Sequence, residues 1–157
     1  MDSVTAALTP AVELDRFFVA DRGGDVIGVI ACTDHTGRAM RVSPADWRRH
    51  LGLVRGALAA RILAPQWTSQ LDYPADTGYI EFVAVAERGR RQGIGTQLVE
   101  GVIAQTHYAD FELEVTDVNA AARECYRKIG FVDVKRKKEK FRRIKGFRER
   151  IYMRYTR

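Results

Sequence analysis

The pattern of hydrophobic and polar positions predicts a β-hairpin near the start of the chain. Two short apolar runs, residues 16–20 and 26–32, flank residues 21–25, which are rich in glycine and aspartate. A short helix is expected before them, over residues 3–14. The hairpin is therefore the first predicted part of a sheet.

A helix is predicted over residues 43–63. Its apolar residues return at steps of three and four, which is typical of a helix with one buried face. The segment opens with a capping serine followed by proline at the first helical position, and it ends before Pro65. Residues 66–77 are polar and contain a proline, so we expect them to form a loop.

The second half of the chain alternates strand and helix patterns and closes with a hairpin. Unbroken or alternating apolar runs predict strands, whereas apolar residues three and four apart predict helices. The predicted order is strand 79–85, helix 93–105, strand 110–115, helix 119–129 ending at Gly130, strand 131–141 and strand 149–155. This order favours an α/β fold of the mixed α+β type, built on one sheet.

Composition places the chain among ordinary globular proteins. At 157 residues it has the size of a single domain, and it contains no run of about 18 apolar residues that could span a bilayer. The N-terminus lacks the pattern of a secretory signal, and the two cysteines are Cys32 and Cys125. We therefore expect no membrane contact, a cytoplasmic setting and two free thiols.

The net charge of +6 is concentrated in one segment. Residues 135–150 hold ten lysines and arginines against two glutamates, and the rest of the chain is close to neutral. Such a segment suits an acidic partner, a ribosomal surface or RNA, and an ordinary solvated face is the alternative.

Three common chemistries lack their residues in this chain. The three histidines are far apart and the two cysteines form no CxxC pair, so no metal site is predicted. No serine lies in a GxSxG elbow, and no complete dinucleotide or P-loop glycine motif occurs.

An Arg- and Gly-rich turn separates strand 79–85 from helix 93–105. Free N–H groups and the positive end of a helix dipole bind anions at such a turn, and glycine lets the ligand approach the backbone. Arg88, Arg90 and Arg91 add positive charge there, which makes a diphosphate the expected ligand. An ordinary surface turn is the alternative.

Residues 85–95 resemble the [Q/R]-x-x-G-x-[G/A] motif of the GNAT acetyltransferase superfamily, with Arg90, Gly93 and Gly95 at its defining positions. Residues 113–131 resemble the second signature of that family, a strand followed by N-x-x-A-x-x-x-Y-x-x-x-G-F. This second stretch is particularly similar to the bacterial N-terminal-alanine acetyltransferases of ribosomal proteins. The two motifs together cover about a third of the chain.

The resemblance implies a single GNAT-like domain over residues 1–157, with splayed central strands and acetyl-CoA (coenzyme A) as cofactor. Relative to the family, the first strand is expected to be missing, and residues 33–78 form a helical insertion. The implied cofactor-binding residues are Val83, Ala84, Val85, Arg90, Arg91, Gln92, Gly93, Ile94, Gly95, Thr96, Asn119 and Tyr126.

The resemblance also implies the catalytic residues. Tyr126 is the expected general acid, with core packing as the alternative role of its ring. The amide of Val85 is the expected oxyanion donor. Glu114 is the preferred general base and Glu81 the second candidate, while a plain exposed strand face is the alternative for Glu114.

The function that follows is an N-acetyltransferase that moves acetyl from acetyl-CoA to a primary amine by direct attack. The acceptor is expected to be a protein N-terminus or a small amine such as a polyamine or an amino-sugar. A non-catalytic acyl-CoA-binding or ribosome- or RNA-associated module on the same fold is the rival function. The oligomeric state stays open, with a homodimer among the candidates.

Overall fold

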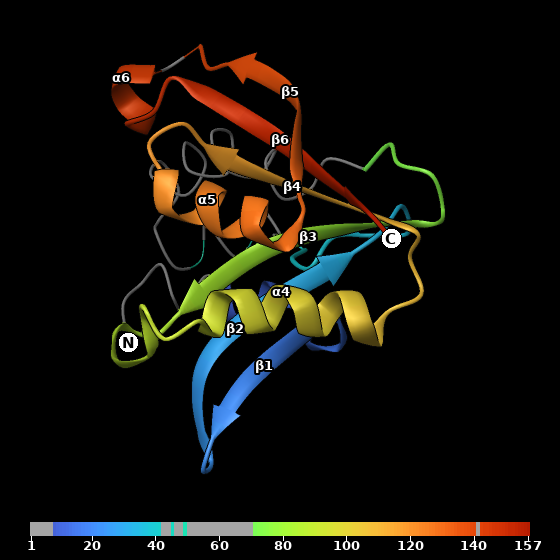
Figure 1. The fold of residues 1–157 in the computed structure, drawn as a ribbon, viewed down its shortest axis with the longest axis vertical. Helices are drawn as coiled ribbons and strands as arrows, with labels where there is room; N and C mark the ends of the chain where they lie inside the picture. Colours follow the sequence, from blue (N-terminus) through green and yellow to red (C-terminus); the bar gives the residue numbers. More distant parts are fainter. Residues whose placement is uncertain (1–7, 42–44, 46–48, 50–70, 141) are drawn as a thin grey trace. The chain divides into compact units, whose positions relative to one another are not determined.

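The computed structural model describes residues 8–41, 45, 49, 71–140 and 142–157 (Figure 1). The chain divides into two compact units, the first formed by residues 1–17 and 33–73 and the second by residues 18–32 and 74–157. Each unit is described by itself below, and the single domain expected over residues 1–157 stays a prediction.

The second unit is built on a six-stranded sheet with the order β1-β2-β3-β4-β6-β5 (Figure 1). β3 and β4 run parallel, whereas β4 and β5 each pair with β6 in an antiparallel manner. This mixed sheet confirms the predicted fold class. Its strands are β1 Phe17–Arg22, β2 Asp25–Thr33, β3 Thr77–Val85, β4 Asp110–Thr116, β5 Val132–Lys138 and β6 Glu149–Thr156.

The predicted first hairpin is confirmed. β1 and β2 are joined by Gly23 and Gly24, which have φ values of 63° and 89°. Two consecutive positive φ angles suit a tight hairpin turn, and glycine adopts them without steric cost. The Asp21 carboxylate accepts a hydrogen bond of 3.1 Å from the Gly24 N–H and braces the turn.

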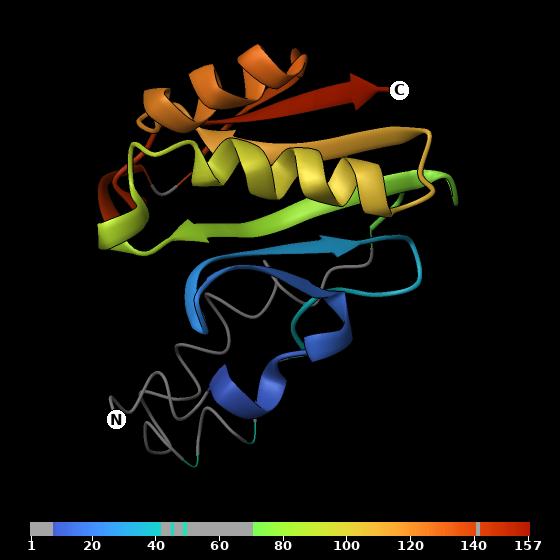
Figure 2. The same ribbon diagram turned by 60° about the horizontal axis from the view of Figure 1, so that its bottom comes forward.

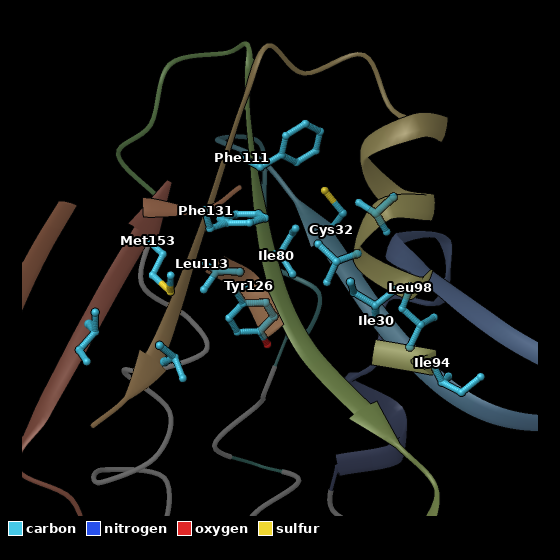
Figure 3. Packing of buried hydrophobic residues seen from close by; sticks show 14 of the residues in the cluster. Ile30, Cys32, Ile80, Ile94, Leu98, Phe111, Leu113, Tyr126, Phe131 and Met153 are labelled. Atoms are coloured by element: carbon cyan, nitrogen blue, oxygen red, sulfur yellow. The ribbon is translucent and has the colours of Figure 1, made fainter. Parts of the chain in front are cut away.

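Two helices pack side by side on one face of the sheet, α4 Ile94–Gln105 and α5 Ala120–Ile129 (Figures 1 and 2). α5 begins at Asn119, whose Oδ1 accepts the N–H of Ala122 at 3.2 Å, and ends at Gly130 with a φ of 117°. The start of this helix at position 119 and its end at Gly130 were both predicted from the sequence, because the signals at helix ends are local. The core between these helices and the sheet includes Ile80, Leu98, Phe111, Leu113, Phe131 and Met153 (Figure 3).

The structure corrects two expected elements. Of the helix predicted over residues 3–14, Leu8 is helical, but from Thr9 onward the prediction is wrong: two short 3-10 helices, η1 Thr9–Ala11 and η2 Leu14–Arg16, stand there instead. Pro10 lacks an N–H and sits where it limits a longer helix. The strand predicted over residues 131–141 ends at Lys138, and a short helix, α6 Arg142–Lys145, lies in the connection to β6.

The helix predicted over residues 43–63 falls outside the described residues except for positions 45 and 49, which are helical. The helical insertion expected at 33–78 therefore stays a prediction, as does the missing first strand. In the described part of the first unit, Val12 and Met40 form an isolated bridge, and the Arg41 Nε lies 3.0 Å from the Glu13 carboxylate. Across the described residues, no helix is both long and apolar enough to cross a membrane.

A carboxylate surrounded by three arginines ties α5 to β5. Asp133 on β5 bonds Arg123 of α5 with both oxygens, and Arg127 and Arg136 approach Asp133 Oδ2 at 3.4 and 3.2 Å. The hydrogen bonds from Arg123 hold the pKa of the Asp133 carboxyl below its ordinary value of 3.8, although burial acts in the opposite direction. This cluster fixes the outer face of the helix that carries Tyr126.

We expect Asp133→Asn to lower the melting temperature by a few degrees at neutral pH. Because the folded-state pKa is depressed, the carboxylate adds stability above its unfolded-state pKa, and that stability is lost as the pH falls through the folded-state pKa. The melting temperatures of the two proteins should therefore converge only after the pH has fallen below the folded-state pKa of Asp133. Glu124→Gln, on the exposed side of α5, is the charge-matched control, and an equal effect from both variants would contradict the role of the cluster.

Candidate active site

β3 and β4 separate halfway along their length. Their ladder runs from Thr77↔Asp110 to Ile80↔Leu113, whereas β3 continues to Val85 and β4 to Thr116. β4 stays paired with β6 to its end. Figure 3 shows the two strands diverging beyond Ile80 and Leu113. The splayed central strands expected from the sequence are thus confirmed.

Phe82 stands at the start of this separation with a φ of 57°. A bulky residue in the left-handed region is a strained conformation that its surroundings must enforce. Before Phe82, Ile80 belongs to the buried core, and after it Val83 and Val85 pack against that core. The side chains that face the core therefore change from an even to an odd position at Phe82. Nothing in the local sequence predicts this bend.

The chain turns after β3 through the short 3-10 helix η3 Glu87–Gly89 and enters α4 at Ile94. Arg91 and Gly93 have φ values of 58° and 78°. Among the described residues no side chain caps α4, so N–H groups of its first turn are available to a ligand. A Cβ on Gly93 would meet nothing within 4 Å, and one on Gly95 would meet only Val85, at 3.9 Å. The turn leaves open space where an anion would sit.

The polar side chains of this turn divide into two groups. Arg88 lies 3.6 Å from the Asp25 carboxylate, and Gln92 is held by its own bond of 2.7 Å to the Arg88 carbonyl and by Arg22 at 3.1 Å. The exposed Arg90 and Arg91 form no ion pair with any residue in the described part of the chain. Two guanidinium groups therefore remain for an anion beside the helix N-terminus.

Tyr126 reaches the separation from α5. Its side chain is only 8% exposed and its ring packs against Phe131, with 6.0 Å between centroids. Figure 3 shows the ring between β3 and β4, with its oxygen directed toward the side on which the strands diverge. Burial, and secondarily the charge of Cys125, raises the pKa of Tyr126 to about 12, so the phenol keeps its proton at neutral pH.

Cys125 of α5 contacts the start of α4, and Asn119 lies at the start of α5. The Cys125 sulfur lies 3.2 Å from the Thr96 hydroxyl in the first turn of α4, and this contact holds the two helices together near the Arg- and Gly-rich segment. The Asn119 side chain is already engaged as the N-cap of α5. Its amide NH₂ is the group that could still donate to a ligand.

The two candidate bases have different surroundings. Glu114 is 32% exposed, lies on the sheet face opposite Leu113 and Val115, and forms an ion pair with Arg150. Its partner across the ladder is Tyr152, whose pKa is raised by burial and by the Glu114 charge. Glu81 is half-buried and is the first residue of β3 beyond the paired segment. Glu114 therefore forms an ion pair, which distinguishes it from the plain exposed strand face that was the alternative for this residue.

Arg150 and Tyr152 are site residues that the sequence reasoning missed. Strand 149–155 alternates apolar and polar residues, and this pattern could have placed both side chains on the face that carries Glu114. The register Glu114↔Tyr152 and Thr116↔Arg150 then brings them beside the carboxylate. The distance along the chain, 36 residues between Glu114 and Arg150, hid the contact.

Comparisons with known proteins agree with this geometry. The family model described as acetyltransferase (GNAT) family matches residues 5–131. A ribosomal-protein-alanine N-acetyltransferase from Brucella melitensis is 18% identical with a TM-score of 0.58, and the match covers 90% of this chain and 68% of that one. No curated protein sequence matches significantly.

Two further solved structures share the fold. The ribosomal-protein-S18-alanine N-acetyltransferase from Escherichia coli is 18% identical over 90% of this chain and 70% of that one, with a TM-score of 0.57. A NatC complex bound to Gag peptide and CoA contains a chain that is 21% identical, with coverages of 88% and 68% and a TM-score of 0.54. At these identities the likeness concerns the fold.

Proposed function

The chain belongs to the acetyltransferase (GNAT) family, and on that basis we propose that it transfers an acetyl group from acetyl-CoA to a primary amine. One observation carries the proposal: the β3–β4 ladder ends at Ile80↔Leu113, and the buried Tyr126 hydroxyl points into the separation. The acceptor is a protein N-terminus or a small amine. A homodimer and a cytoplasmic setting stay predictions.

The residues of the turn fit the diphosphate of coenzyme A. In this proposal the amides from Arg91 to Thr96 hold the diphosphate, assisted by the guanidinium groups of Arg90 and Arg91. The open space beside Gly93 gives the phosphates access to the backbone. The segment Val83–Ala84–Val85 binds the pantetheine arm along its backbone, and Asn119 donates to the same arm. A CoA-bound neighbour of the same fold supports this assignment.

The chain's own groups then supply the proton transfers. Glu114, or alternatively Glu81, takes a proton from the acceptor ammonium so that the neutral amine can attack the acetyl carbonyl. The Val85 N–H donates to the oxygen that gains negative charge, an interaction worth on the order of 3 kcal/mol. The attack would form the C–N bond first, and Tyr126 would then give its proton to the sulfur as the C–S bond breaks. The second proton that the attacking nitrogen loses would return through water to the Tyr126 oxygen.

The rival function is a non-catalytic acyl-CoA-binding or ribosome- or RNA-associated module. The ion pair between Glu114 and Arg150 favours this rival, because a base must give up that contact in part to accept a proton. An acyl-CoA-binding module would still bind the cofactor and a ribosome- or RNA-associated module need not, but only the transferase requires the Tyr126 hydroxyl.

Gly93→Asp should weaken coenzyme A binding about tenfold relative to Gly93→Asn, measured by calorimetry. Asn and Asp are among the residues that tolerate the left-handed backbone at this position, and they have nearly the same size, so the two variants differ mainly in charge. A carboxylate repels the diphosphate, whereas an amide does not. Equal affinities in the two variants would place the diphosphate elsewhere.

Tyr126→Phe should lower kcat at least about tenfold and leave the KM for acetyl-CoA nearly unchanged. The ring packing against Phe131 survives, and only the proton donor is lost. In the parent protein kcat should stay level between about pH 8 and pH 10, because the pKa of Tyr126 is about 12. Tyr155→Phe, in the same aromatic cluster, is the control. An unchanged kcat across several amine acceptors would remove Tyr126 from the mechanism.

Glu114→Gln should reduce kcat/KM at least about tenfold near pH 7 and much less above about pH 9, where an α-amino acceptor is already neutral. Glu81→Gln is the matched variant on the other strand. A larger loss in Glu81→Gln, with the same recovery at high pH, would assign the base to Glu81. A loss in Glu114→Gln that persists at high pH would make Glu114 structural through Arg150.

A further inference from the structure

A pocket of about 590 Å³ lies just beyond the C-terminal end of β4. One side is formed by the two residues that follow this strand, and the other by the connection between β5 and β6. The lining residues are Asp117, Val118, Arg142, Gly146, Phe147 and Arg148. The pocket is therefore at the end of β4 where β3 has already separated from it.

Some cations around this pocket form ion pairs with carboxylates, and others form none within the described residues. Lys145 lies 2.5 Å from Glu139, and Arg150 bonds Glu139 at 2.8 Å as well as Glu114, so these two stabilise the hairpin. The exposed Arg142 and Arg148, in contrast, form no ion pair or side-chain hydrogen bond with any residue that the structure describes. The fold of the hairpin does not depend on their charge.

One carboxylate lines the pocket, that of Asp117. Its Oδ1 accepts the backbone N–H of Arg148 at 3.1 Å, so it fixes the loop. Two guanidinium groups against one carboxylate leave the pocket with a net positive charge. Guanidinium groups bind carboxylates and phosphates in a bidentate manner, and the half-buried Phe147 gives the pocket an apolar wall.

A short series of contacts joins the pocket to the candidate base. The Phe147 ring lies 5.2 Å from the guanidinium carbon of Arg150, and Arg150 pairs with Glu114. Two side chains, Phe147 and Arg150, thus separate the pocket from Glu114.

We propose that this pocket, through Arg142 and Arg148, binds an anionic group of the acceptor. The substrate class is then an amine that also carries a carboxylate or a phosphate, such as a peptide whose first residues are acidic. This inference rests on the proposed function for its acceptor, while the anion binding itself is independent of turnover.

The test compares two double variants of equal charge. Arg142→Gln with Arg148→Gln removes both pocket cations, and Lys137→Gln with Lys138→Gln removes two exposed cations of β5 that do not line the pocket. Three peptides serve as probes: one that begins Ala-Asp-Glu, its Ala-Asn-Gln counterpart, and one with phosphoserine at the second position. Binding in the presence of coenzyme A is measured by calorimetry, and acetylation is measured separately.

We expect the acidic or the phosphorylated peptide to bind the parent protein at least about tenfold more tightly than the amide peptide. The pocket variant should lose this preference and the β5 variant should keep it. The peptide that shows the larger loss identifies carboxylate or phosphate as the preferred group. Equal loss in both double variants, or no preference in the parent protein, would overturn the proposal.

Acetylation separates this inference from the proposed function. If acidic peptides bind through the two arginines but no peptide or small amine is acetylated, the anion pocket stands and the transferase function fails. If amines are acetylated equally well with and without an acidic group, and the pocket variant is unaffected, the function stands and the pocket assignment is overturned. A change confined to the KM for acetyl-CoA would also overturn it.

Discussion

The early end of the β3–β4 ladder determines the rest of the candidate site. β4 keeps its hydrogen bonds to β6 along its whole length, so the separation beyond Ile80↔Leu113 is a departure of β3. The positive φ of Phe82 accompanies it. Strained backbone of this kind costs free energy and persists only where the surrounding packing enforces it. Val83 and Val85, which follow Phe82, pack against the core.

Two helices place candidate functional groups beside this separation. α4 brings an uncapped N-terminus with positive φ values at Arg91 and Gly93, which suits an anion. α5 brings the Tyr126 hydroxyl, whose proton is retained because the ring is buried. The contact between Thr96 and Cys125 and the arginines around Asp133 hold α5 in place from its two sides.

The lysines and arginines of residues 135–150 fall into two groups. Some cations are neutralised by carboxylates within the hairpin, as with Lys145, Arg150 and Glu139. Others, such as Arg142 and Arg148, face a pocket without a described acidic partner of their own. One part of the basic segment therefore stabilises the hairpin beside Glu114, and the charge of the other part is not neutralised by an ion pair within the described residues.

The sequence alone determined the elements whose signals are local. The helices α4 and α5, the end at Gly130 and the two family motifs depend on residues within a few positions of one another, because helix periodicity and capping act over one turn. For the same reason the turn after β3 could be proposed as a candidate anion site. The 3-10 helices at the start and α6 were missed, since short elements carry little periodic signal.

Tertiary structure decided what depends on strand register and burial. The pairing of Glu114 with Arg150 joins residues 36 positions apart, and no local pattern specifies which strand lies beside β4. The conformation of Phe82, the raised pKa of Tyr126 and the pocket near Arg148 likewise arise from packing between distant segments. The sequence therefore named Tyr126, Glu114 and the turn after β3, whereas the fold added Arg150 and Tyr152 and determined which side chains contact one another.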